Sequence, residues 1–390
     1  MSNLPNFDTV SIEDATDRLI DYRGKTPPKA NSGVRLVTAK VVKGGQILDE
    51  PAEFIATDFY DEWMRRGLPR KLDVLLTTEA PLGEVAVLRD NEKIALAQRI
   101  ILLRAKSGHV DPLFLFYALQ SDYGQSELKA RASGTTVLGI KQSELRQVRI
   151  PIFPLPVQQR IASILSAYDE LIENCQKRIR ILETMARALY REWFVQFRFP
   201  GNEKVPLVNS PIGNIPEGWA VKKLGDILKL NYGKALKKEE RYGGQFPVFG
   251  SSGIVGYHNA SLVNGPGIIV GRKGNIGSVF WCDDDFFVID TAYFVTSTTP
   301  LRYLFYVLPT LNFINSDAAV PGLSRNQAYT LEIVVPPAAL LKRFSEMAET
   351  FQRQASTLLG QINNLRRTRD LLLPRLLSEH VKLENQESKG

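Results

Sequence analysis

Clusters of cationic side chains beside aromatic and amide groups are the feature of this sequence with the clearest chemical potential. Arginine and lysine placed among tyrosine and tryptophan suit contact with nucleic-acid phosphates and stacking against bases. Each of these cations is also compatible with an ordinary solvated surface. The candidate DNA contacts are Arg65, Arg66, Arg70, Lys71, Lys141, Gln142, Lys234, Lys237, Lys238, Arg241, Arg272, Lys273, Arg325 and Asn326.

One candidate loop, GRKGNIGSVFW (271–281), combines glycines with the adjacent cations Arg272 and Lys273. The backbone N–H groups of such a loop can cradle a phosphate, and a hairpin turn between two strands explains it equally well. The matching stretch in the first half, TTEAPLGEVAVLRD (77–90), carries Glu79 instead. A glutamate can accept a hydrogen bond from cytosine N4, although exposed glutamates are usually only solvated.

A second pair of candidates follows equivalent glycines in the two halves. Lys141 lies in GIKQ and Arg325 lies in GLSRNQ, with the amides Gln142 and Asn326 beside them. Arginine can read guanine, and an amide side chain can read adenine. A turn or capping role fits the same residues, so both interpretations stay open.

Residue patterns typical of catalysis are missing from the sequence. There is no Asn/Asp-Pro-Pro-Tyr/Phe tetrapeptide of an amino-methyltransferase and no G-x-x-x-x-G-K-[ST] phosphate loop. The histidines are far apart, and Cys175 and Cys282 lack metal-ligand spacing. We therefore expect a chain that is not an enzyme by itself and that binds no metal or cofactor.

The bulk composition narrows the class of protein only slightly. The net charge of +7, from 49 basic and 42 acidic residues, is too small to establish nucleic-acid binding by itself. No apolar run approaches the roughly 18 residues of a membrane span. Because cysteine is also rare, we expect a cytoplasmic protein that does not bind a membrane.

Two long helices are expected to position the candidate residues. In each, apolar residues alternate at spacings of four and three, which specifies a coiled-coil seam. The two seams are offset by 183 residues, as Ile161 and Phe344 are, and Arg369 is the one polar position. The seam residues are Ile161, Leu165, Tyr168, Ile172, Ile179, Leu182, Leu189, Phe344, Phe351, Leu358, Ile362, Leu365 and Leu372. Such seams can pair antiparallel within the chain, as a spacer or for stability alone.

The same offset continues upstream of the helices. Residues 139–161 align without a gap with residues 322–344, and each copy contains a glycine turn, a short strand, a proline break and a helix start. The remaining expected strands are 34–42, 72–79, 84–90, 94–105, 267–282 and 286–297, and the expected module helices are 111–123 and 299–311. The halves therefore read as diverged copies of one module.

The predicted fold is α+β, with two globular α/β modules separated by a pair of long antiparallel coiled-coil helices and an internal pseudo-two-fold duplication. The expected domains are a first module (1–153), a first helix (154–198), a linker (199–214), a second module (215–336), a second helix (337–380) and a tail (381–390).

Several stretches of this sequence resemble one protein family. They are GIKQSELRQVRIPIFPLP (139–156), PLPVQQRIASIL (154–165), LYREWFVQFRFPG (189–201) and IPEGWAVKKLGDI (215–227). In these stretches the chain is similar to the specificity (S) subunit of type I restriction–modification systems. The second copy departs from the pattern, because PPAALLKRF (336–344) lacks the Gln-Gln-Arg of the first.

The resemblance implies a function that the composition does not. Each module would be a target recognition domain that reads one half of a bipartite double-stranded DNA sequence, and the coiled coil would set the spacer. Two methyltransferase (M) subunits would bind S-adenosylmethionine and methylate adenine N6. Restriction (R) subunits would bring ATP- and Mg-dependent cleavage. The alternative is a coiled-coil scaffold for protein interaction without DNA specificity.

Overall fold

The computed structural model describes residues 7–22, 24–313 and 322–377. The predicted tail, 381–390, lies outside the described residues. Within the described part of the chain, no helix is both long enough and apolar enough to cross a membrane.

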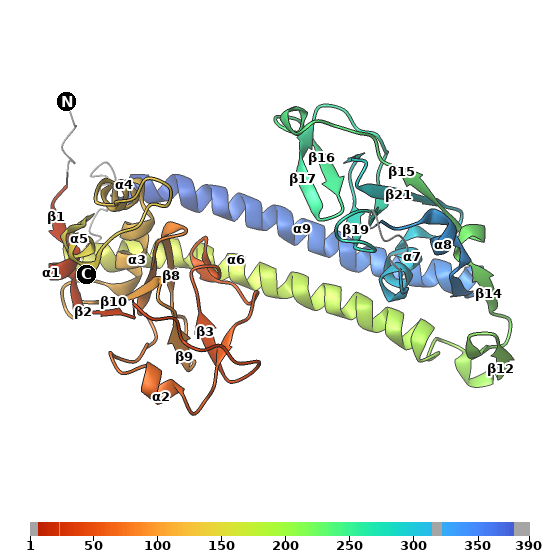
Figure 1. Cartoon of the computed structure of the whole chain (residues 1–390), viewed down its shortest axis with the longest axis horizontal. Coiled ribbons are helices and arrows are strands. Elements are labelled where there is room, and N and C mark those ends of the chain that lie inside the picture. The colour runs from red at the N-terminus through yellow and green to blue at the C-terminus, as the bar shows by residue number, and fades with distance from the viewer. Residues whose placement is uncertain (1–6, 23, 314–321, 378–390) are drawn as a thin grey trace, which may run out of the picture. The chain divides into compact units, whose positions relative to one another are not determined.

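The chain divides into two compact units, and each long helix contributes to both. The first unit comprises Met1–Cys175 with Gln361–Gly390, and the second comprises Gln176–Gly360. Helix α6 (Leu155–Tyr190) begins after the first module, and helix α9 (Ala338–Leu377) begins after the second (Figure 1). Each unit is therefore one module together with the adjoining parts of two helices.

The first module is built around two sheets. Its larger sheet has the antiparallel order β2-β10-β7-β8, and its smaller sheet places β3 between β6 and a parallel β9. Every residue of β7 is buried, which fits its run of Val, Leu and Thr. The elements are β1 (Thr9–Ser11), α1 (Ile12–Ala15), β2 (Thr16–Asp21), β3 (Val34–Val37), β4 (Val42–Lys43), β5 (Gln46–Ile47), β6 (Phe54–Ile55), α2 (Tyr60–Trp63), β7 (Val74–Thr78), β8 (Leu82–Val87), β9 (Ile94–Leu96), β10 (Ile100–Ala105), α3 (Pro112–Gln120), α4 (Asp122–Ala130), α5 (Gln142–Gln147) and β11 (Arg149–Pro151).

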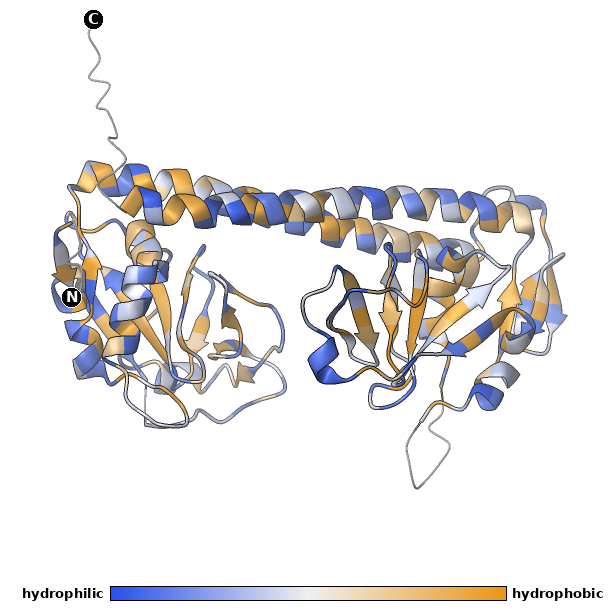
Figure 2. Ribbon diagram, turned by 90° about the horizontal axis from the view of Figure 1, so that it is seen from above, coloured by the Kyte–Doolittle hydropathy of each residue, from blue (hydrophilic) through white to orange (hydrophobic). Residues whose placement is uncertain are grey.

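The second module repeats this plan. Its larger sheet has the antiparallel order β15-β21-β18-β19, and its smaller sheet places β16 between β17 and a parallel β20. A hairpin, β12–β13, lies partly in the predicted linker. The elements are β12 (Leu207–Ser210), β13 (Gly213–Pro216), β14 (Ala220–Lys223), β15 (Leu228–Tyr232), β16 (Phe246–Gly250), β17 (Gly253–His258), β18 (Gly267–Gly271), β19 (Val279–Cys282), β20 (Phe287–Val288), β21 (Ala292–Ser297), α7 (Leu301–Val307), α8 (Arg325–Thr330) and β22 (Glu332–Val335). Apolar residues gather in the strands of both modules, as Figure 2 shows.

Backbone hydrogen bonds match the two modules residue by residue. Ile140 N donates to Thr78 O at 3.0 Å, and Leu323 N donates to Arg272 O at 2.8 Å. Because Leu323 is the counterpart of Ile140 at the offset of 183, Arg272 is the counterpart of Thr78. This confirms the sequence alignment of TTEAPLG with GRKGNIG, in which Lys273 corresponds to Glu79.

The helix predicted at 111–123 is wrong in one respect, because the segment holds all of one helix, α3, and the start of another, α4. Ser121 separates α3 from α4, with an extended backbone. Its hydroxyl accepts a hydrogen bond from Gly124 N at 3.1 Å and so caps α4. The apolar periodicity of the first helix concealed this cap.

Three predicted strand runs are each broken into two. The run 267–282 forms β18 and β19, the run 94–105 forms β9 and β10, and the run 286–297 forms β20 and β21. At the break Ala97 N donates to Val37 O at 2.9 Å, and in the second module Ile289 N donates to Phe249 O, also at 2.9 Å. The chain therefore leaves the small sheet and enters the large one at the same point in each module.

The seam residues of the helices are covered in the structure. Each predicted seam position is buried or half-buried, whereas Leu171, Ile181 and Leu359, which lie off the seam, are exposed. Part of this cover comes from the modules. Ile161 belongs to the buried cluster of the first module, and Phe344 belongs to that of the second.

The first long helix ends before residue 198, where the prediction placed its end. The α-helix stops at Tyr190 and continues as a π-helical turn over Arg191–Val195. Phe197 then adopts a left-handed backbone with φ 56°. The buried rings of Trp193 and Phe194 pack around Phe344, with centroid distances of 6.2 and 4.9 Å. The turn that follows α6 is therefore part of the core of the second unit.

The one polar seam position joins a cluster of charges in the first unit. Arg369 Nη1 of α9 donates to Asp169 Oδ1 of α6 at 2.5 Å, and Tyr117 Oη of α3 donates to Asp169 Oδ2 at 2.6 Å. Arg89 Nη2 lies 3.8 Å from the same carboxylate. Burial raises the pKa of Tyr117, so its hydroxyl stays protonated as a donor. The cluster ties α9, α6 and the first module together.

We expect the substitution Arg369→Met to lower the free energy of unfolding by about 1–3 kcal/mol, because it removes a donor from a largely buried carboxylate. Urea unfolding of the full chain measures this change. The matched control is Arg366→Met on the exposed face of α9, where the effect should stay within about 0.5 kcal/mol. Equal losses in the two variants would contradict the structural role of the cluster.

Candidate nucleic-acid interface

In the second module, four of the predicted contact residues lie around one pocket. It has a volume of about 410 Å³. It opens where β15 and β18 end and where α8 begins. Its lining residues are Tyr232, Arg272, Lys273, Tyr293, Gly322, Leu323, Ser324, Arg325 and Asn326. Residues from four separate stretches of the sequence therefore converge on one site.

The loop after β18 is a tight hairpin turn that holds Arg272 and Lys273. Gly277 N donates to Gly271 O at 2.9 Å, and Gly271 N donates to Ser278 O at 2.8 Å. A Cβ on Gly271 would lie 2.1 Å from Asn275 O, so only glycine fits there. Of the two interpretations of this sequence, the hairpin turn is therefore confirmed, and the turn presents both cations to the pocket.

Two arginines of the pocket contact the same tyrosine ring. The Cζ atom of Arg325 lies 4.3 Å from the ring centroid of Tyr232, and that of Arg272 lies 4.9 Å from it. Arg272 Nη1 donates to Asp290 O at 2.9 Å, and Arg325 Nη1 donates to Leu230 O at 3.4 Å. Each guanidinium is thus held by a ring and one carbonyl, with further N–H groups left over.

The tyrosines beneath these arginines form a firm base for the pocket. The rings of Tyr232 and Tyr293 lie 5.1 Å apart, and Tyr293 Oη donates to Leu323 O at 2.9 Å. Burial raises the pKa of Tyr293 to about 12, so this hydroxyl remains a donor at neutral pH. Tyr232 remains 47% exposed, which leaves part of its side chain accessible from the pocket.

The positive charge in this pocket is not neutralised by the protein. Among the described residues, no ion pair involves Arg272, Lys273 or Arg325. Three cations in one open pocket attract an anion or an acceptor-rich group. The site can therefore bind phosphate oxygens or the acceptor edge of a base.

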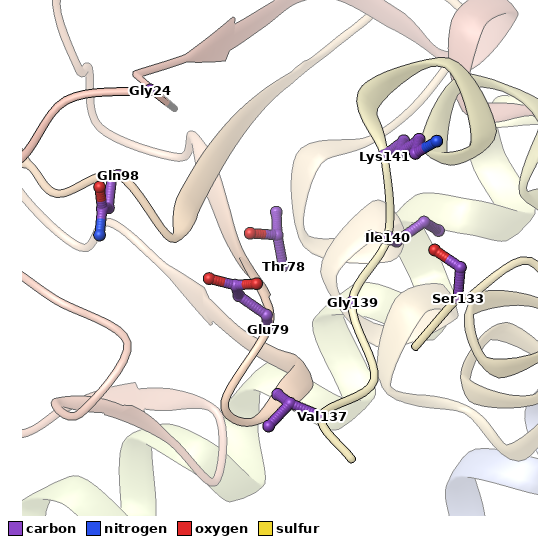
Figure 3. A pocket seen from close by; sticks show the side chains of 9 residues that line it. All are labelled: Gly24, Thr78, Glu79, Gln98, Ser133, Val137, Gly139, Ile140 and Lys141. Carbon is purple, nitrogen blue, oxygen red and sulfur yellow. The ribbon is translucent and has the colours of Figure 1, made fainter. Parts of the chain in front are cut away.

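The first module has a pocket at the equivalent place, with a volume of about 340 Å³. Figure 3 shows Thr78 and Glu79 between Gln98 and the segment that carries Gly139 and Lys141. The complete lining is Gly24, Thr78, Glu79, Gln98, Ser133, Val137, Gly139, Ile140 and Lys141. The pocket of the second module is therefore lined by cations, whereas the equivalent pocket of the first module is lined by both Glu79 and Lys141.

The acidic residue of this pocket has a partner of its own. Arg99 Nε lies 2.8 Å from Glu79 Oε1, and both side chains remain nearly half exposed. Glu79 can still accept a hydrogen bond from a ligand, since a carboxylate has several acceptor sites. Gln142, another predicted contact, begins α5 directly after Lys141.

The remaining candidates of the first module are scattered. Arg65 and Arg66 line a separate pocket of about 570 Å³ with Tyr22 and Trp63, whose rings stack at 5.7 Å. Arg65, which follows α2, pairs with Glu62 at 3.6 Å. Arg70 and Lys71 lie outside the lining of this pocket, on the exposed loop before β7.

The remaining candidates of the second module lie near the turn after β15. Lys234, Lys237 and Lys238 are exposed, and none of them lines the cationic pocket. Arg241 is half-buried and donates from Nε and Nη2 to Leu236 O at 3.1 and 2.6 Å. Its guanidinium therefore closes a turn.

Sequence reasoning did not select several residues that line the two pockets. Tyr293 lies inside a strand run, and nothing in its spacing distinguishes it from a core residue. Gln98 and Ser133 come from stretches without a motif, and Thr78 belongs to a buried strand. The available signal was the alignment of 77–90 with 271–281, which places Thr78 opposite Arg272.

Comparison with known proteins identifies the family. A family model for the type I restriction modification DNA specificity domain matches residues 38–184 and 216–365. This chain belongs to that family. It is a specificity subunit with two recognition domains, and it is not an enzyme by itself. The predicted membership of the specificity-subunit family is confirmed, and the alternative of a scaffold without DNA specificity is not supported.

Individual relatives agree with this assignment. The chain is 28% identical over 345 residues to the MjaIX specificity subunit of Methanocaldococcus jannaschii, covering 80% of this chain and 78% of the relative. It is 23% identical to the EcoprrI specificity subunit of Escherichia coli, covering 82% and 77%. The S subunit of Mycoplasma genitalium has a similar fold, with a TM-score of 0.58 at 19% identity and coverage of 96% and 97%.

The cationic pocket of the specificity subunit generates a salt-dependence prediction. We expect Lys273→Gln to make the plot of log binding constant against log salt shallower by about one, as loss of one phosphate contact requires. DNA-binding titrations of the assembled complex over a range of KCl concentrations measure this slope. Lys223→Gln, on an exposed lysine of β14 outside the pocket, is the control. An unchanged slope in Lys273→Gln would show that this lysine does not contact the backbone.

Proposed function

We propose that each module of this specificity subunit reads one half of a bipartite double-stranded DNA target through its strand-end pocket. The observation that carries this proposal is the matched position of the two pockets. The same backbone hydrogen bond places Thr78 in one and Arg272 in the other. A constant frame with different polar side chains is suited to reading two different sequences.

We further propose that α6 and α9 pair along their seams as an antiparallel coiled coil that sets the spacing of the two half-sites. Contacts inside each unit support this pairing. Cys175 Sγ lies 3.8 Å from Gln361 Oε1 in the first unit, where Asp169 also binds Arg369. In the second unit Trp193 packs on Phe344. The residue numbers of these contacts increase along α6 and decrease along α9, as an antiparallel pair requires.

The chemistry of the complex is assigned to partner subunits. We infer that two methyltransferase subunits assemble on this chain, one for each module, because the duplication offers two equivalent surfaces. They would bind S-adenosylmethionine and methylate adenine N6, and restriction subunits would use ATP and Mg. Apart from the end of the first helix, the predicted domain boundaries belong to the same proposal, as does a cytoplasmic location, where prokaryotic DNA lies.

Methylation sequencing of DNA from cells that produce this chain with its methyltransferase subunit tests the proposed function. We expect a methyl-adenine motif of two defined halves separated by unspecified bases. Cells that produce the methyltransferase subunit alone are the control and should lack the motif. A continuous motif, or none from a complex that methylates DNA, would contradict the proposal.

The spacer proposal predicts the effect of lengthening both helices together. Seven residues inserted after Cys175 and seven before Gln361 preserve the heptad on both sides and add roughly 10 Å of helix. We expect the unspecified spacer to lengthen by at most about three base pairs, since B-DNA rises 3.4 Å per base pair. The half-site sequences should not change, and methylation sequencing reads both quantities.

The matched control for this insertion changes only one helix. Seven residues inserted after Cys175 alone shift its seam against an unaltered partner, so we expect loss of a stable complex. An unchanged spacer in a double-insertion variant that still methylates DNA would contradict the proposed role of the helices.

A further inference from the structure

We propose that Arg272 and Arg325, held against Tyr232, read a guanine in the half-site of the second module. This inference rests on the proposed function and names the base that one pocket recognises. The geometry points to guanine because its major-groove edge carries two acceptors, O6 and N7, side by side. An arginine fork donates two parallel hydrogen bonds to that pair.

The hydrogen bonds within the protein leave the required donors available. Each arginine has one Nη1 bond to a backbone carbonyl, Asp290 O for Arg272 and Leu230 O for Arg325. The Nε and Nη2 groups of both have no partner in the described structure and remain for a ligand. Because Tyr232 contacts both guanidiniums, less side-chain entropy is lost when a base binds.

The alternative ligand for these two arginines is a DNA phosphate. Both arginines are half-buried in the pocket and stacked on a ring, whereas phosphate contact requires only an accessible cation. Lys273, on the same turn, carries a point charge without a fork and therefore suits a phosphate better than the paired acceptors of a base. Adenine fits less well than guanine, because its N6 amino group would face a donor.

The first module provides an internal comparison. At the positions of Arg272 and Arg325 it carries Thr78 and Gln142. Neither of these side chains can supply a guanidinium fork. The guanine contact is therefore specific to the second module, and a change at Arg325 should alter only one half of the target.

The test is methylation sequencing of the assembled complex with the variants Arg325→Lys, Arg325→Gln and Arg272→Gln. Arg325→Lys keeps the charge and removes the fork. We expect the wild-type motif to contain a G·C pair in one half. Preference for that guanine should fall roughly 10- to 100-fold in each variant, with the other half unchanged. Lys223→Gln, which removes an exposed charge outside the pocket, should leave both halves as they are.

Three outcomes would overturn the guanine assignment while the proposed function stands. One is a bipartite wild-type motif in which one of the halves lacks a G·C pair and the Arg325 variants change that half. Another is a uniform loss of methylation with an unchanged motif, as phosphate contact predicts. The third is a motif that Arg325→Gln and Arg272→Gln leave fully intact. Failure of the proposed function differs from all three, because the wild-type motif would then not be bipartite. If the Arg325 variants do not fold, Arg272→Gln identifies the half read by the second module, and a wild-type motif without a G·C pair in either half overturns the assignment by itself.

Discussion

The burial of apolar stripes on α6 and α9 is the constraint on which the rest of this structure depends. Each module leaves apolar surface uncovered, and residues of both helices complete its core. In the first unit Leu165 and Leu376 join the module's buried cluster, and in the second Phe344 does so with Trp193. At about 25 cal/mol per Å² of apolar surface, such contacts anchor each module to both helices. The module and its helices therefore form one structural unit.

Within each module, the residues that form the core differ from most of those that line the pocket. Apolar residues of the large sheet share a buried cluster with residues of the helices, as Leu76 does with Leu165 and Leu376. The pocket residues Glu79, Arg272 and Lys273 lie outside the buried clusters. Thr78 and Glu79 in one module correspond to Arg272 and Lys273 in the other, on the same backbone hydrogen bonds. Thr78 is buried in β7, whereas Glu79, Arg272 and Lys273 are only half-buried. Under the proposed function, these three half-buried side chains can vary to determine which base is bound.

The sequence predicts the helices well because periodicity over many residues is a cooperative signal. It predicts the pockets less completely, because their residues meet only after folding. Tyr293 becomes a pocket residue through the pairing of β21 with β15, and no local pattern records that pairing. Arg241 resembles a DNA contact in sequence, yet its guanidinium binds Leu236 O. Short breaks such as Ser121 are equally hidden, since one capping hydroxyl decides them.

The most direct test of the account is the methylation motif of a chain with two copies of the first module. Residues 9–160 would replace residues 221–343, with junctions at positions that the strand pairing and the gapless alignment make equivalent. Antiparallel helices that carry identical modules predict a target whose two halves are inverted repeats of the first half-site. A direct repeat, or persistence of the original second half-site, would contradict the account.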